Sequence, residues 1–61
     1  MAIKISEQTY GGHIFMKLQL PSGRIEAIDV FLRSDGIHYR TTADQTAEIR
    51  QQIIDAFHAL Y

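Results

Sequence analysis

Residues 13–33 read HIFMKLQLPSGRIEAIDVFLR, and the pattern of this segment predicts the central part of the fold. From His13 to Leu20 every second residue is a large aliphatic one, and a second run rich in β-forming residues follows the Pro-Ser-Gly turn signal at 21–23. Alternation with a period of two is typical of a strand that buries one face. The stretch therefore predicts a β-hairpin with strands at about 13–20 and 24–33.

The turn length predicts the register of this hairpin. A three-residue turn at 21–23 places Met16 opposite Ile28 and His13 opposite Phe31. This pairing gathers the apolar side chains on one face, whereas a slip by one residue would scatter them.

A second hairpin is predicted downstream, where Asp35-Gly36 has the composition of a two-residue type I′ turn. The third strand then covers about 37–42. In this register Phe31 faces Arg40, and the guanidinium is expected to lie over the aromatic ring as a cation–π pair.

Two parts of the predicted sheet are less regular. Ile25 and Glu26 fall out of phase with the alternation, which predicts a bulge or a frayed edge there. Residues 2–6 either form a fourth, edge strand, because Ile3 and Ile5 alternate with a lysine, or remain a frayed terminus.

A C-terminal helix is predicted at about 43–60, packed on one face of this meander. Thr42 and Gln45 have capping-box spacing, Asp44 suits the positive N-terminal end of the helix dipole, and His58 suits the last turn. The fold class is therefore α+β, with three or four antiparallel strands followed by one helix.

The apolar positions of this helix cover a broad arc. One stripe is expected to face the sheet, and it contains Ile49, Ile53, Ala56, Phe57 and Leu60. A second edge recurs every seven residues, and it contains Ala47, Ile54 and Tyr61. Because the arc is wider than three strands should cover, this edge is either a broad core contact with an exposed isoleucine or an interface with a second subunit.

Length and composition narrow the function classes. The 61 residues make one domain, 1–61, and so short a chain has a marginal core. Disulfides and thiolate zinc sites are excluded because there is no cysteine, so a partner subunit is the expected additional source of stability. Six basic residues against seven acidic ones argue against a protein that coats nucleic acid in general.

The sequence predicts a soluble, cytoplasmic protein. Its first residues lack the basic and apolar regions of a secretory signal, and no apolar run approaches the ~18 residues of a membrane span. The predicted helix also carries few basic residues for a membrane-surface anchor.

Motifs for chemistry are missing from the sequence. There is no Gly-x-Ser-x-Gly elbow and no phosphate-binding glycine loop. Asp29 is the only acid in mid-sheet, and it is expected to pair with Lys17, Arg33 or Thr42 rather than act in catalysis. We therefore expect no enzyme activity, no cofactor and no small-molecule substrate.

The three histidines do not predict a metal site. His13 and His38 share a sheet face but lie on its two outer predicted strands, roughly 10 Å apart, with Phe31 and Arg33 between them. His58 is on the helix, behind the sheet. We expect no bound metal.

The exposed sheet face has the most informative composition. Its candidate partner-binding residues combine basic and aromatic side chains: His13, Phe15, Lys17, Phe31, Arg33, His38 and Arg40. Such a face is used in protein–protein contacts, whereas nucleic-acid platforms stack bases on exposed rings between basic residues. An ordinary solvated surface is the third alternative.

The order of three strands followed by a helix resembles two groups of proteins. These are the arm-type DNA-binding domains of tyrosine recombinases and the small dimerising regulators of bacteria and their phages. The net charge of −1 departs from the DNA-binding pattern. We therefore expect a homodimeric regulator or adaptor that binds another protein, with nucleic-acid binding by the basic-aromatic face as the alternative.

Overall fold

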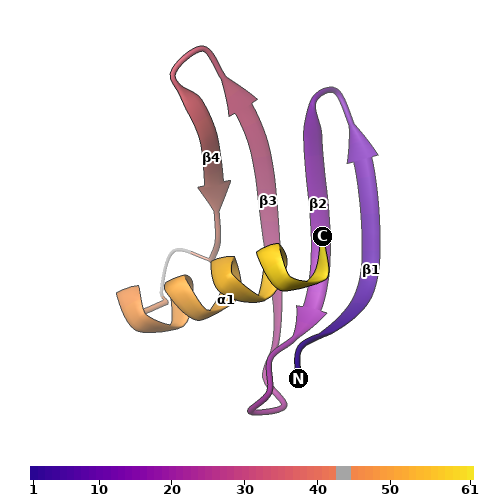
Figure 1. Ribbon diagram of the computed structural model, residues 1–61, viewed down its shortest axis with the longest axis vertical. Helices are drawn as coiled ribbons and strands as arrows, with labels where there is room; N and C mark the ends of the chain where they lie inside the picture. Colours follow the sequence, from indigo (N-terminus) through magenta and orange to yellow (C-terminus); the bar gives the residue numbers. More distant parts are fainter. Residues whose placement is uncertain (43–44) are drawn as a thin grey trace.

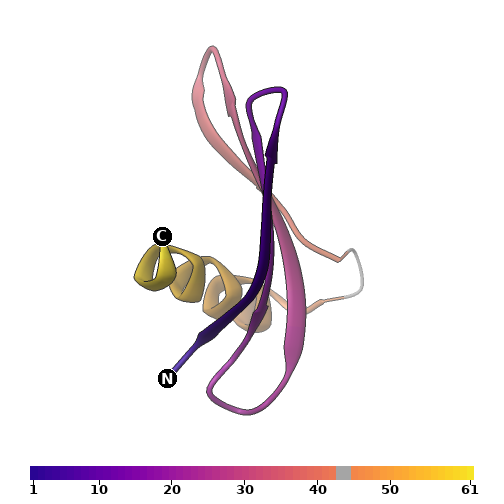
Figure 2. The ribbon, with the colours of Figure 1, turned by 90° about the vertical axis from the view of Figure 1, so that its right-hand side faces the viewer.

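Four antiparallel strands and one helix form an α+β fold, as the sequence predicts. The computed structural model describes residues 1–42 and 45–61. The elements are β1 (Ile3–Tyr10), β2 (His13–Gln19), β3 (Ile25–Arg33), β4 (Gly36–Arg40) and α1 (Ala47–Leu60). The strands follow one another in the order β1-β2-β3-β4, and α1 crosses one face of the sheet (Figure 1, Figure 2).

The hairpin of β2 and β3 has the predicted register, with His13 opposite Phe31. The Leu20 amide donates a hydrogen bond of 2.8 Å to the Arg24 carbonyl and closes the turn. The alternating pattern of β2 and β3 thus determined both the pairing and the two faces.

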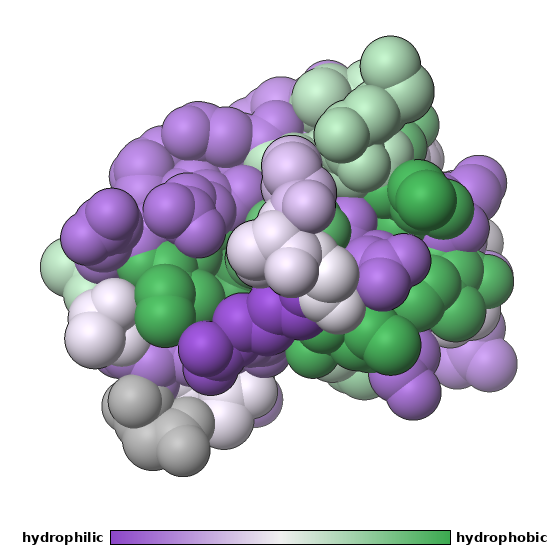
Figure 3. Space-filling model, turned by 90° about the horizontal axis from the view of Figure 1, so that it is seen from below, coloured by the Kyte–Doolittle hydropathy of each residue, from purple (hydrophilic) through white to green (hydrophobic). Residues whose placement is uncertain are grey.

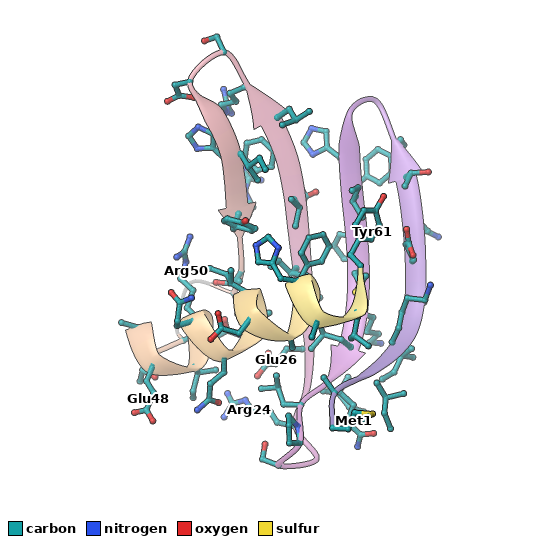
Figure 4. All side chains as sticks on the ribbon, in the orientation of Figure 1. Met1, Arg24, Glu26, Glu48, Arg50 and Tyr61 are labelled. Carbon is teal, nitrogen blue, oxygen red and sulfur yellow. The ribbon has the colours of Figure 1, made fainter. Side chains whose placement is uncertain are left out.

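The bulge expected at Ile25 and Glu26 is wrong, because both residues pair regularly with β2. Ile25 lies half-exposed on the face away from the helix. Glu26 lies on the helix side, where it accepts a hydrogen bond of 2.5 Å from Gln45 Nε2 and pairs with Arg24 (Figure 4). The two donors satisfy a carboxylate at an inward position, so the strand needs no bulge.

The hairpin of β3 and β4 is shifted by two residues from the predicted register. Phe31 lies opposite His38, and Arg40 lies opposite Asp29, so the expected pairing of Phe31 with Arg40 is wrong. A shift of two residues leaves each side chain on its predicted face. Accordingly, the composition of the two faces is as predicted although the neighbours differ.

The conformation of the turn explains this shift. Ser34 and Asp35 form the turn, and Gly36 follows with a φ of 129°. A type I′ turn centred on Asp35-Gly36 would require a positive φ at Asp35. Among the residues that the structure describes, only glycines have a positive φ.

Strand β1 confirms the edge strand and extends it well beyond residue 6. Gly11 and Gly12, with φ values of 52° and 81°, provide the two-residue turn into β2. The register shifts between Lys4 and Ser6, where β1 has one extra residue. This irregularity, unlike the expected one in β3, lies at the edge of the sheet.

Helix α1 begins at Ala47, later than the predicted residue 43. Its N-cap is Thr46, whose hydroxyl accepts a hydrogen bond of 3.2 Å from the Ile49 amide. Thr42 is therefore not the cap, and the position proposed for Asp44 lies outside the described residues. His58 lies in the last turn, as predicted.

The core lies between α1 and the middle of β2 and β3. Its fully buried side chains are Met16, Leu18, Ile28 and Ile53. The predicted helix stripe is confirmed, since its members are buried or packed against this cluster.

The helix leaves part of the inner sheet face uncovered. It runs across the strands, over the half of the sheet nearer the 21–23 turn (Figure 1). A helix is about 10 Å wide, whereas the nine residues of β3 span about 30 Å. In the described part of the chain, no helix is long and apolar enough to cross a membrane.

Candidate interaction surfaces

An apolar groove occupies the sheet face beside the helix, and we call it the upper groove. Its volume is about 280 Å³, and its lining includes Ile14, Leu32, Ile37, Tyr39, Phe57 and Tyr61. Three of these side chains are largely exposed: Leu32 at 73%, Tyr61 at 64% and Ile37 at 55%. Leu32 and Ile37 are partners across β3 and β4, so they form one continuous apolar ridge.

Tyr61 forms the helix side of the upper groove. It caps the C-terminal end of α1, and its ring stacks on Phe57 with centroids 5.2 Å apart. Figure 4 shows Tyr61 at the end of the helix, beside the uncovered part of the sheet. The groove therefore lies between an aromatic pair of the helix and the hairpin of β3 and β4.

The predicted oligomer edge of the helix is only partly exposed. Ala47 and Tyr61 are exposed, but Ile54 retains 7% exposure and belongs to the core. The expectation of an exposed Ile54 is thus wrong.

Contacts on both sides of Ile54 explain its burial. One turn before it, Arg50 donates a hydrogen bond of 3.2 Å to the Tyr39 carbonyl. One turn after it, His58 Nε2 lies 2.7 Å from the Tyr39 hydroxyl. The end of β4 is therefore fastened against this side of the helix, and Ile54 is enclosed there.

A second hollow lies at the end of the molecule near the 21–23 turn. It measures about 540 Å³ and is lined by Ala2, Leu20, Gln52, Asp55 and Ala59, among others. The Asp55 carboxylate accepts a hydrogen bond of 3.0 Å from Gln51. Figure 3 views this end and shows separate hydrophobic patches between hydrophilic ones.

The opposite side of the sheet, which we call the outer face, carries the seven predicted partner-binding residues. The register places their side chains together across β2, β3 and β4: His13, Phe15, Lys17, Phe31, Arg33, His38 and Arg40. Strand β1 adds Tyr10 opposite His13. The structure thus brings the predicted set together and extends it to a fourth strand.

Four rings form a stacked row across the outer face, one from each strand. The centroids are 5.8 Å apart for Tyr10 and His13, 5.0 Å for His13 and Phe31, and 5.7 Å for Phe31 and His38. Neighbouring planes are inclined by 6–26°. Nearly parallel rings at these distances are offset from one another rather than directly face to face.

The charged groups of the outer face have neighbours other than those predicted. Arg33, not Arg40, lies over the Phe31 ring, with its guanidinium carbon 5.1 Å from the centroid. In the part of the chain that the structure describes, Asp29 pairs with none of its predicted partners Lys17, Arg33 and Thr42; its two oxygens lie 3.1 and 3.2 Å from His13 Nδ1. The two-residue shift of β4 accounts for the first difference, since it moves Arg40 away from Phe31.

His38 and Asp35 form a second histidine–carboxylate pair. His38 Nε2 lies 2.7 Å from Asp35 Oδ1. The hydrogen bond from His38, together with its charge, lowers the pKa of the Asp35 carboxyl below its ordinary value.

The three histidines do not meet at one place in the structure. Phe31 separates His13 from His38 in the ring row, and His58 lies on the helix across the sheet. Within residues 1–42 and 45–61, no cluster of three or more histidine, aspartate or glutamate side chains could hold a metal ion.

Sequence reasoning missed three residues of these surfaces. Tyr10 belongs to a strand longer than expected, and the Gly-Gly turn that follows it could have indicated that the strand extends to residue 10. Leu32 and Ile37 alternate correctly as inward residues, but no pattern indicated that the helix would leave them uncovered. Their exposure follows from the direction of the helix across the sheet.

The fold and its two surfaces define an α+β protein with a four-stranded meander and one crossing helix. Comparison of the chain with protein families, characterised proteins and solved structures finds no match.

Proposed function

We propose that the protein is a non-enzymatic interaction module of the cytoplasm, a homodimeric regulator or adaptor that binds another protein. The observation that carries this proposal is the upper groove, where Leu32, Ile37 and Tyr61 are each more than half exposed. Contiguous apolar surface of this kind marks interaction sites in small proteins.

A second copy of the chain is the occupant that we propose for the upper groove. The exposed ridge of Leu32 and Ile37 and the hollow beside it lie on the same face. A two-fold axis can therefore place the ridge of each copy in the groove of the other. The chain has no cysteine for a disulfide, and association is a common additional source of stability for a small domain.

The exposed area suggests a weak dimer. Burying Leu32, Ile37 and Tyr61 in both copies contributes roughly 8 kcal/mol, at about 2 kcal/mol for a fully exposed side chain. Association costs about 4–15 kcal/mol in lost freedom. The two terms are similar in size, so dimerisation should depend on protein concentration in the micromolar to millimolar range.

Sedimentation velocity over this concentration range tests the dimer. We expect the wild-type mass to rise toward that of a dimer, and Ile37→Ser to keep the protein monomeric because it removes half of the apolar ridge. Ile25→Ser is the matched control, since Ile25 has 53% exposure, close to the 55% of Ile37, but lies on the outer face. A monomer at the highest concentration, or equal loss of association in both variants, would contradict the proposal.

The outer face is the proposed contact for the protein partner. In its stacked row, His13 and Phe31 each have a nearly parallel ring on both sides, with centroids 5.0–5.8 Å apart, and these gaps are too narrow for a base to insert between the rings. A nucleic-acid base needs an exposed ring face for stacking. This arrangement favours a protein over single-stranded nucleic acid.

A further inference from the structure

We propose that the outer face binds an acidic segment of a partner protein, and that protonation of His13 and His38 strengthens this binding. The inference deepens the proposed protein-binding function by stating the chemistry of the partner and a condition that regulates its binding.

Three cationic side chains supply the fixed positive charge of this surface. Lys17, Arg33 and Arg40 are exposed and come from three adjacent strands. Among the residues that the structure describes, none of them forms an ion pair. Their charges are therefore available to carboxylates of a partner, which an arginine can bind through two parallel hydrogen bonds.

Within residues 1–42 and 45–61, two carboxylates lie on this side of the sheet, and each contacts a histidine. Asp29 lies 3.1 Å from His13, and Asp35 lies 2.7 Å from His38. Three fixed positive charges against two carboxylates leave one net positive charge, and this becomes three when both imidazoles are protonated. Histidine titrates in the range between about pH 5 and 8, so the charge of the surface changes under mild acid.

The surroundings of the two histidines are otherwise simple. His13 lies between the Tyr10 and Phe31 rings, beside Asp29. His38 stacks on Phe31 and contacts Asp35, and the positively charged Arg33 and Arg40 occupy the same face.

The stacked row also selects the kind of anion. The His13 and His38 side chains are 38% and 39% exposed within the row, and aromatic edges carry partial positive charge. Carboxylates can approach such edges and the arginines together. The spacing of 5.0–5.8 Å between ring centroids leaves no room for a base to insert between neighbouring rings, which favours a polypeptide over a single-stranded nucleic acid.

Amide NMR titration with a short oligo-glutamate peptide tests the proposal. The titration is run at about pH 7.5 and about pH 5.5, on the two sides of the histidine range. We expect shifts at His13, Phe31, His38 and Arg40, and an affinity about fivefold higher at the lower pH, from two added charges at an exposed surface. Arg40→Gln should weaken binding at both pH values.

Two double variants separate charge from packing. The double variant His13→Phe and His38→Phe keeps four rings in the row but removes the ionisable imidazoles. The double variant His13→Gln and His38→Gln removes the imidazoles and, with them, two of the four rings. Either folded variant should bind the peptide with equal affinity at the two pH values. His58→Gln, on the helix, is the matched control, and this variant should still bind the peptide more tightly at the lower pH.

Three outcomes would overturn the inference. They are equal wild-type affinity at the two pH values, peptide shifts confined to the upper groove, and tighter binding of a thymidine oligonucleotide of equal charge. The last would replace the polypeptide with a nucleic acid. The dimer is tested separately by sedimentation of Ile37→Ser, so failure of one proposal is distinguishable from failure of the other.

Discussion

Asp29 and Asp35 illustrate how exposure determines what a single carboxylate can contribute to stability. The Asp29 side chain is 16% exposed and lies within the sheet, whereas that of Asp35 is 71% exposed in a turn. Both contact a histidine, but solvent screens the exposed pair strongly. The Asp35–His38 pair should therefore lower the pKa of the Asp35 carboxyl without contributing much to the free energy of unfolding.

At this residue scale, we predict that the pKa of the Asp35 carboxyl lies below 3.8 and rises toward that value in His38→Gln. The folded pKa is lower than the unfolded one, so the stabilisation is present above the unfolded pKa and is lost as the pH falls through the folded pKa. Carboxyl-carbon NMR titration of both proteins measures the midpoint. The Asp55 midpoint should not respond to the substitution, and an unchanged Asp35 midpoint would show that the contact does not form in solution.

At the scale of the element, the start of α1 depends on which threonine supplies the cap. Thr42 and Gln45 have the better capping-box spacing in sequence, yet Thr46 makes the hydrogen bond to Ile49. The Gln45 side chain instead donates to Glu26 of β3. A tertiary contact thus holds the residue before the cap outside the helix.

We predict that Thr46→Ala lowers the free energy of unfolding by about 1 kcal/mol, because the Ile49 amide loses its acceptor. Thr42→Ala, the matched control, should change it by less than about 0.5 kcal/mol. Urea denaturation followed by circular dichroism measures both. A larger loss in the Thr42 variant would place the start of the helix four residues earlier, where the sequence pattern put it.

At the scale of the whole molecule, the crossing of α1 divides the sheet into a covered and an uncovered part. Met16, Leu18 and Ile28 have no exposed surface beneath the helix, whereas Leu32 and Ile37 lie beyond it. Local stability should follow this division, because segments with few buried contacts open more readily.

Hydrogen exchange should therefore be slowest at the amides around Met16 and Ile28 and faster at Leu32 and Ile37. If the upper groove joins two copies, exchange at Leu32 and Ile37 should slow as protein concentration rises, while that of the core amides changes less. Exchange measured by NMR at two concentrations provides this comparison. Uniform protection along β3 at low concentration would show that the uncovered part is as stable as the core.

The sequence by itself determined the strands of the central hairpin, its register and the composition of both sheet faces. These features are local, since alternation with a period of two assigns each side chain to a face and the turn length sets the pairing. For the same reason the two-residue error in β4 did not disturb the outer face: Phe31, Arg33 and His38 still point to one side.

Only the tertiary structure decided which neighbours meet and which apolar residues remain uncovered. The stacking of Phe31 on His38 depends on the β4 register, which the turn at Ser34 and Asp35 sets. The burial of Ile54 and the exposure of Leu32 depend on the path of α1 across the strands. That path is fixed by long-range packing between the helix and the sheet, and helical periodicity, which assigns a face but no direction, cannot encode it.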